Sequence, residues 1–266
     1  MRAVMALVAV FCMTVASGPA IDARPADAGP QEPSYLLLDA ANGELLDARW
    51  VDRDRPLPLG SLIKPFTALA YAGAHRLTYP SVVCRGRADG CWLPDGHGQV
   101  DIVRAIAGSC NAYFHHLSQR TSSEMLASTL RRFGVPASAG AITPASMVGL
   151  GTGLLLAPSA VARGYLELAA RATQPGVVPV AEGLILSARS GTGRAVGEAM
   201  GPADAFAKTG TAPCVHVPRT SGDGYAAVVY PADRPRLVLL VQAHGRTGAE
   251  TAALAGPLLR HAVEVR

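Results

Sequence analysis

Short apolar runs with the spacing of β-strands lie near both ends of the chain. Near the N-terminus two runs flank Asn42-Gly43, and an Asn-Gly pair between apolar segments is a strong signal for a β-hairpin. The last quarter holds three more runs. The expected strands are 35–38, 44–47, 205–211, 224–230 and 236–243. This pattern predicts an antiparallel sheet that both ends of the chain build together.

Between these strands, apolar positions recur with the spacing of helices. The segment 122–133 is typical, because Gly134 and Pro136 follow it and would end the helix there. The expected helices are 61–74, 100–107, one that follows residue 109 and runs to 117, 122–133, 159–171 and 180–194, with a last, apolar-striped helix at 247–264.

We therefore predict a two-lobed α/β fold of the α+β kind. Its antiparallel sheet comes from both chain ends and is flanked by helices, and the middle of the chain forms an all-helical lobe. We assign residues 29–266 to one domain, with 33–60 and 182–266 in the sheet lobe and 61–181 in the helical lobe. A cleft between lobes is where a small-molecule site is expected.

The first 28 of the 266 residues are typical of a secretory signal peptide. Arg2 precedes an apolar run over 4–16, and Ala26-Asp27-Ala28 is one candidate cleavage site. We expect an exported protein, periplasmic or otherwise extracytoplasmic. An uncleaved signal that tethers it to the membrane stays open as an alternative. A net charge of +4 without a basic cluster argues against nucleic-acid binding.

Two cysteines lie close together in an irregular segment, 82–98. Export and this close spacing favour a disulfide between Cys84 and Cys91. A metal site that includes His97 is the alternative, but the spacing matches no recognisable zinc pattern. Cys110 and Cys214 are interpreted as unpaired packing residues. We expect no metal and no cofactor.

Candidate chemistry begins where a loop turns into the helix at 61–74. Ser61 stands at the helix start, where a hydroxyl can cap free backbone N–H groups. Lys64 follows one helical turn later, on the same face. A serine becomes a good nucleophile when a base takes its proton, and a lysine with a lowered pKa can be that base. The alternative is a capping serine beside a solvated lysine.

Composition favours the catalytic interpretation. Of 24 basic residues only Lys64 and Lys208 are lysine, and the others are arginine. Asparagine is as scarce: Asn42 lies in the predicted turn, and Asn111 lies in Ser109-Cys110-Asn111. The second lysine begins Lys208-Thr209-Gly210-Thr211-Ala212. The chain thus holds S-x-x-K, S-x-N and K-T-G in that order.

This set resembles the penicillin-binding transpeptidase family of the serine β-lactamase and D,D-peptidase superfamily. The likeness covers nearly the whole mature chain. It also includes the G-x-G segment at 149–151 that precedes Pro158, and Ser190-Gly191-Thr192-Gly193, which matches the family's G-T-G. The resemblance implies a β-lactamase/transpeptidase-like fold, peptidoglycan stem peptides as substrates and β-lactams as inhibitors.

The resemblance also implies roles for individual residues. Ser61 would attack the carbonyl of a D-alanyl-D-alanine peptide, with Lys64 as its base. Ser109 would pass a proton to the leaving amine, and Asn111 would hold the substrate amide. The terminal carboxylate would bind at Lys208, Thr209 and Thr211, around Gly210. Backbone N–H groups of Ser61 and Thr211 would form the oxyanion hole.

Some features depart from the family pattern. Leu59 stands in place of the usual proline, and Ala207 in place of a frequent glycine. The deacylating E-x-x-L-N motif of class A lactamases is absent from the sequence. A D,D-transpeptidase or carboxypeptidase is therefore favoured over a serine β-lactamase. A non-catalytic wall-binding or β-lactam-sensing module is the third alternative, although a pure binder would not need Lys64.

Overall fold

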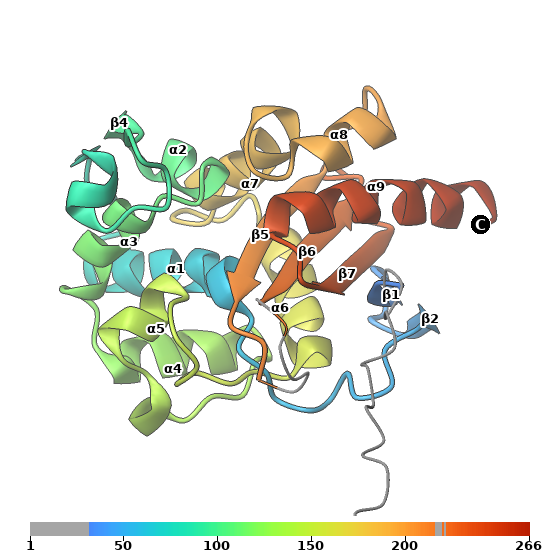
Figure 1. Cartoon of the computed structure of the whole chain (residues 1–266), viewed down its shortest axis with the longest axis horizontal. Helices are drawn as coiled ribbons and strands as arrows, with labels where there is room; N and C mark the ends of the chain where they lie inside the picture. The colour runs from blue at the N-terminus through green and yellow to red at the C-terminus, as the bar shows by residue number, and fades with distance from the viewer. Residues whose placement is uncertain (1–31, 216–219, 221) are drawn as a thin grey trace, which may run out of the picture. The chain divides into compact units, whose positions relative to one another are not determined.

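The computed structural model describes residues 32–215, 220 and 222–266, so the predicted signal peptide lies outside the described residues. Five strands form one antiparallel sheet in the order β2-β1-β7-β6-β5 (Figure 1). Their bounds are β1 Ser34–Asp39, β2 Leu45–Ala48, β5 Phe206–Ala212, β6 Asp223–Tyr230 and β7 Leu237–His244. The predicted hairpin and the sheet from both chain ends are confirmed. Strand β5 ends the sheet and pairs only with β6.

Helices cover both faces of the sheet. Successive side chains of a strand point to opposite faces, so alternate residues pack against different helices. In β7, Val238 and Leu240 pack on one side with α6 (Pro158–Ala170), whereas Leu237, Leu239 and Val241 pack on the other with α9 (Gly248–Glu264). Helix α9 begins with a capping box between Thr247 and Glu250, which fixes its first turn beside β5. The sheet therefore has no solvated face along its centre.

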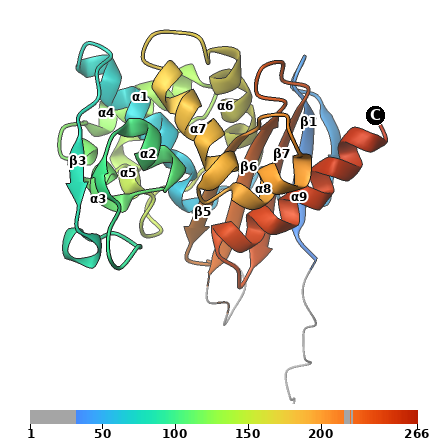
Figure 2. The same ribbon diagram turned by 90° about the horizontal axis from the view of Figure 1, so that it is seen from above.

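The middle of the chain is mostly helical (Figure 2), but the prediction of an all-helical lobe is wrong, because residues 82–84 and 98–100 form a small strand pair. A 3₁₀ turn, η1 (Gly60–Ile63), leads into α1 (Lys64–Ala74). The others are α2 Ile102–Ala107, α3 Asn111–Ser118, α4 Ser123–Arg132, α5 Pro144–Val148, α7 Val178–Ser190 and α8 Arg194–Met200, with short 3₁₀ turns η2 (Gly86–Asp89) and η3 (Ala139–Ala141). The predicted boundary between lobes at residue 182 falls inside α7 and stays a prediction.

Some elements differ from the prediction. The helix predicted over 180–194 ends earlier, at Ser190 in α7, because Gly191 terminates it and Thr192 N–H donates to Ala107 O at 3.1 Å, and the unexpected helix α8 begins at Arg194. Helix α5 is only five residues long and depends on the reciprocal cap between Thr143 and Ser146. Strands β3 (Val82–Cys84) and β4 (Gly98–Val100) form a separate small antiparallel pair within a segment expected to be irregular.

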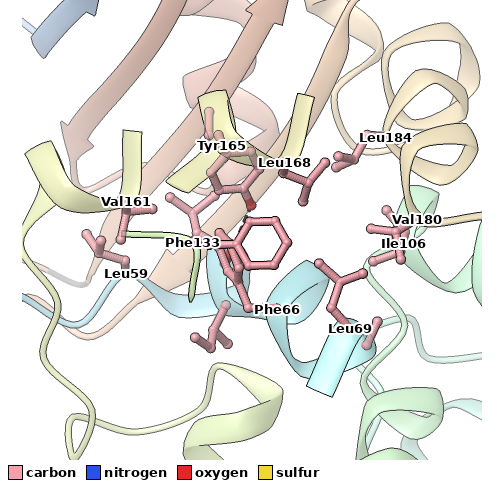
Figure 3. Packing of buried hydrophobic residues seen from close by; sticks show 14 of the residues in the cluster. Leu59, Phe66, Leu69, Ile106, Phe133, Val161, Tyr165, Leu168, Val180 and Leu184 are labelled. Atoms are coloured by element: carbon pink, nitrogen blue, oxygen red, sulfur yellow. Dashed lines mark hydrogen bonds between the residues drawn. The ribbon is translucent and has the colours of Figure 1, made fainter. Parts of the chain in front are cut away.

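An aromatic cluster anchors α1 in the core (Figure 3). The Phe66 ring packs edge-on against Phe133 and Tyr165, with ring centroids 5.8 and 5.6 Å apart. Tyr165 also donates its buried hydroxyl to Leu62 O at 2.9 Å, which ties α6 to η1. Such pairs contribute about 0.5–1.5 kcal/mol each beyond area burial. These packed rings therefore fix the position of the segment that carries Ser61 and Lys64.

None of the helices that the described residues form is long and apolar enough to cross a membrane.

Candidate active site

Ser61 and Lys64 lie at the junction between η1 and α1. The capping role suggested for Ser61 is wrong, because Leu59 and Ile63 occupy the cap positions and neither helix has a side-chain cap. The Ser61 hydroxyl instead meets its neighbour one turn later, with Lys64 Nζ 2.7 Å from Ser61 Oγ. The S-x-x-K spacing thus places a nucleophile and an amine in direct contact.

Lys64 Nζ is also surrounded by the S-x-N segment. It donates to Asn111 Oδ1 at 2.7 Å and to the backbone oxygen of Ser109 at 3.2 Å, and it lies 3.3 Å from Ser109 Oγ. Ser109 joins α2 to α3, and Asn111 opens α3. Residues 45 and 47 positions apart from Lys64 therefore converge on one amine.

Ser109 has a strained backbone, with a φ of 51° in the left-handed region. A non-glycine residue rarely adopts this conformation, and such strain is concentrated at functional sites. The backbone oxygen of Ser109 accepts hydrogen bonds from Lys64 Nζ and from Trp92 Nε1, both at 3.2 Å. Trp92 Nε1 also donates to Gly108 O at 3.1 Å, so the indole supports the whole turn.

Lys208 approaches Ser109 from the opposite side. Its Nζ donates to Ser109 Oγ at 2.8 Å and to its neighbour's backbone oxygen, Thr209 O, at 2.8 Å. The Ser109 hydroxyl therefore lies between two lysines. The register of β5 against β6 is regular from Phe206 to Ala212, so Lys208 points to one side of the strand. The hydroxyls of Thr209 and Thr211 point to the other, as the strand period predicts.

Both lysines are fully buried, with no exposed side-chain surface. Burial lowers the pKa of Lys64 to about 7, because the charged amine loses its hydration, and it lowers the pKa of Lys208 well below its ordinary value. The proximity of Lys64 lowers the pKa of Lys208 further, since two like charges disfavour each other. Lys64 can therefore be neutral near neutral pH and accept a proton.

A cavity of about 420 Å³ opens beside these groups. Ser61, Ser109 and Asn111 line one part of it, and Thr209, Gly210 and Thr211 of the edge strand β5 line another. Lys208 does not line the cavity and reaches it only through its contact with Ser109. A larger hollow of about 790 Å³ exists between α6, α7 and the loop after α8, but the lysine–serine cluster does not open into it.

Gly60 allows η1 and β5 to meet backbone to backbone. It has a φ of 57°, and a Cβ at this position would lie 2.3 Å from Thr211 O and 2.9 Å from Thr211 N. Any other residue would therefore both strain the turn and push the strand away. The close approach places the backbone beside Ser61 against that of Thr211. Two N–H groups of this kind can stabilise an oxyanion when both face the same atom.

Among the lining residues that were not predicted as site residues, Trp92 and Thr192 are hydrogen-bonded to predicted ones. Trp92 is about half exposed, at 52 %, yet its indole is fixed over the Ser109 turn. Thr192 of the G-T-G segment accepts a hydrogen bond from Thr209 Oγ1 at 2.6 Å. The motif was recognised in the sequence, but its contact with β5 is long-range. Trp92 belongs to no motif, and its only signal was that the chain has two tryptophans.

The expected disulfide is wrong, because Cys84 and Cys91 are both free thiols. Within the described residues, two groups of side chains could hold a metal ion: Cys84, Cys91, His97 and Cys110, and separately Cys214, Asp223 and His244. In the second group the Asp223 carboxylate already accepts hydrogen bonds from Gln242 Nε2 at 3.0 Å and contacts His244 Nδ1 at 2.6 Å.

The family model described as penicillin-binding protein transpeptidase domain matches residues 51–264. No curated protein matches the chain. Similar solved structures include PBP2 of Pseudomonas aeruginosa in complex with WCK 5153, at 19 % identity and a TM-score of 0.72, with 90 % of this chain and 74 % of that chain covered.

PBP2 of Helicobacter pylori in complex with MreC is another, at 17 % identity and a TM-score of 0.72, with 88 % of this chain and 60 % of that chain covered. A third is the apo transpeptidase domain of penicillin-binding protein 3 from Burkholderia pseudomallei, at 18 % identity and a TM-score of 0.67, with 87 % and 88 % covered. At these identities the structures show a shared fold, which confirms the predicted fold class.

Proposed function

Because the chain belongs to the penicillin-binding protein transpeptidase domain family, we propose that it cleaves D-alanyl-D-alanine stem peptides of peptidoglycan through an acyl-serine. The observation that carries this proposal is the contact of Lys64 Nζ with both Ser61 Oγ and Asn111 Oδ1, each at 2.7 Å, inside the buried site. An amine held this way can keep its lone pair directed at the serine hydroxyl when it is neutral.

The proposed acylation uses the groups around this amine in order. Ser61 Oγ bonds to the carbonyl carbon of the penultimate D-alanine while its proton moves to Lys64 Nζ. The backbone N–H groups of Ser61 and Thr211 stabilise the oxyanion. The C–N bond then breaks, and the leaving amine of the terminal D-alanine takes a proton through the Ser109 hydroxyl. An acceptor amine or water releases the acyl group from Ser61.

Substrate recognition is assigned to the cavity walls. The Asn111 side chain would hold the substrate amide, and the hydroxyls of Thr209 and Thr211 would meet the terminal carboxylate. Lys208 would support the carboxylate from behind the strand, where a bound anion favours the protonated form of a buried lysine. β-Lactams, which carry both a reactive carbonyl and a carboxylate, would enter the same cavity as inhibitors.

One observation favours a peptidase over a β-lactamase. The described residues that line the cavity include no aspartate or glutamate. A carboxylate general base is one way to activate the water that deacylates the serine. With none at the cavity wall, a penicillin acyl-enzyme is expected to persist rather than turn over.

The test is labelling with a fluorescent penicillin, followed by the loss of label with time. Stable labelling supports the peptidase, rapid loss would assign a β-lactamase, and no labelling would assign a non-catalytic binder. Intact mass after benzylpenicillin should show one adduct on the native chain and none on Ser61→Ala. An adduct that persists in Ser61→Ala would reject Ser61 as the nucleophile.

Export and any membrane tether belong to this proposal as well. Peptidoglycan lies outside the cytoplasm, so the substrate requires the extracytoplasmic location that residues 1–28 predict. MreC is the partner of the Helicobacter pylori PBP2 in its solved complex. Pull-down of this chain from the cells that produce it would identify any cell-wall protein that binds it.

A further inference from the structure

Four side chains from separate parts of the chain converge next to the S-x-N segment. Cys84 ends β3, Cys91 follows η2, His97 precedes β4, and Cys110 directly precedes α3. Their Sγ and Nδ1 or Nε2 atoms all lie within 4.8 Å of one another. The three cysteines are buried and His97 is partly buried. Three of the chain's five cysteines therefore face one point together with a histidine.

The distances between these atoms fit a tetrahedral metal site. His97 Nδ1 is 3.5 Å from Cys84 Sγ and 3.5 Å from Cys91 Sγ, and Cys91 Sγ is 4.0 Å from Cys110 Sγ. Zinc bonds of about 2.3 Å to sulfur and about 2.0–2.1 Å to nitrogen in a tetrahedron separate the ligand atoms by about 3.8 Å for S···S and about 3.6 Å for S···N. A disulfide would use only two of these four groups.

The surroundings of the four side chains support metal ligation. The Nε2 edge of His97 faces Gly108, where a Cβ would come within 2.9 Å of that nitrogen. A histidine ligand characteristically presents its second nitrogen to a backbone group, and the Gly108 backbone lies on this side of the His97 ring.

We propose that Cys84, Cys91, His97 and Cys110 bind one Zn²⁺ ion. Thiolate and imidazole are ligands that zinc favours, and the three thiols would release their protons to solvent on binding. Four protein ligands leave no open position, so the site is structural rather than catalytic. The proposal stands independently of the proposed function, because zinc content is measured without any turnover.

The metal would position the neighbouring site. Cys110 lies between Ser109 and Asn111, both of which contact Lys64. Trp92, next to Cys91, donates to the backbone oxygen of Ser109. A metal ion bound to Cys91 and Cys110 would therefore fix the strained Ser109 turn at two points: directly through Cys110, and through Trp92, which is next to Cys91. We infer that metal loss loosens this turn and slows acylation, while Ser61 stays in place on η1.

The first test measures the zinc content of the purified protein by inductively coupled plasma mass spectrometry. The full chain is purified with reductant and equimolar Zn²⁺, and free metal is then removed by gel filtration. We expect one zinc per chain, lost in Cys84→Ser and in His97→Ala and retained in Cys214→Ser, the matched control. A native chain without zinc, or ligand variants that keep it, would overturn the proposal.

A second measurement does not depend on whether the variants fold. The native chain is stripped with a chelator and titrated with Co²⁺ alone. Thiolate ligation should give a sulfur-to-cobalt charge-transfer band that saturates at one equivalent and disappears when Zn²⁺ is added. No such band, or peptide mapping that finds a Cys84–Cys91 disulfide in the exported protein, would contradict the site.

Discussion

The pKa of Lys64 can be tested through the pH dependence of acylation. Lys64 acts as a base only when it is neutral. A lysine with its ordinary pKa is about one part in 3,000 neutral at pH 7, because 10.5 − 7 is 3.5 units. Burial lowers the pKa of Lys64 to about 7, so about half of the protein is neutral at pH 7. Burial alone thus supplies a gain of about a thousandfold in active base.

The sign of the profile follows from this pKa. The neutral form is lost as the pH falls below about 7, so the second-order acylation rate should be about one tenth of its plateau at pH 6 and about one hundredth at pH 5. Above pH 8 the rate should be flat. The assay is stopped-flow reaction with a chromogenic β-lactam whose own carboxylate stays ionised over this range.

Two variants separate Lys64 from other titrating groups. Lys64→Met should lower acylation by about 10²–10⁴-fold and remove the acid limb, which is the range for loss of a positioned base. His115→Asn removes a nearby histidine whose pKa burial lowers, and the limb should be unchanged. A flat profile from pH 5 to 9, or a limb that disappears in His115→Asn, would refute Lys64 as the base.

Three further changes probe the strand and the turn. Lys208→Ala should slow acylation by a D-Ala-terminated thioester far more than by its amidated twin, and equal losses would assign Lys208 to the pKa of Lys64 instead. Gly60→Ala should lower the free energy of unfolding by about 2–5 kcal/mol, through strain and overpacking against Thr211. The control Gly245→Ala, with a φ of 68° and open space around its Cβ, should cost about 1 kcal/mol in chemical denaturation. Ser109→Ala should slow acylation by about 10²-fold or more in the same stopped-flow assay, and an unchanged rate would remove Ser109 from the proton path.

The periodic parts of the fold were predictable, because their signals are local. Short apolar runs and the Asn42-Gly43 turn predicted the five sheet strands, and helical spacing predicted α1, α4, α6 and α9. The elements that were missed are short or long-range. Helix α5 has five residues and depends on one cap, and the β3–β4 pair has three residues in each strand. Too few residues contribute to give such elements a periodic signal.

The same distinction applies to the site. Ser61 and Lys64 were predictable because one helical turn joins them. The motif order identified Ser109, Asn111 and Lys208, but no spacing could show that Ser109 lies between two buried lysines. The cysteine cluster was misinterpreted for the same reason. Zinc patterns in sequence require closely spaced pairs, whereas these ligands are brought together by the small β3–β4 pair and the start of α3.

The site combines several features that each destabilise a folded chain. Lys64 and Lys208 are buried without a carboxylate partner among the described residues, and Ser109 adopts a left-handed backbone. A protein keeps such features where function needs them and offsets them elsewhere. Here the packed rings around Phe66 fix α1 in the core, and the pairing with β6 fixes β5. The remaining support is the segment 92–99, which carries Trp92 and His97 and in which no residue is buried. A metal ion held by His97 and the three cysteines around this segment would supply the rigidity that side-chain packing does not, and this explains why the proposed ligands surround the S-x-N segment.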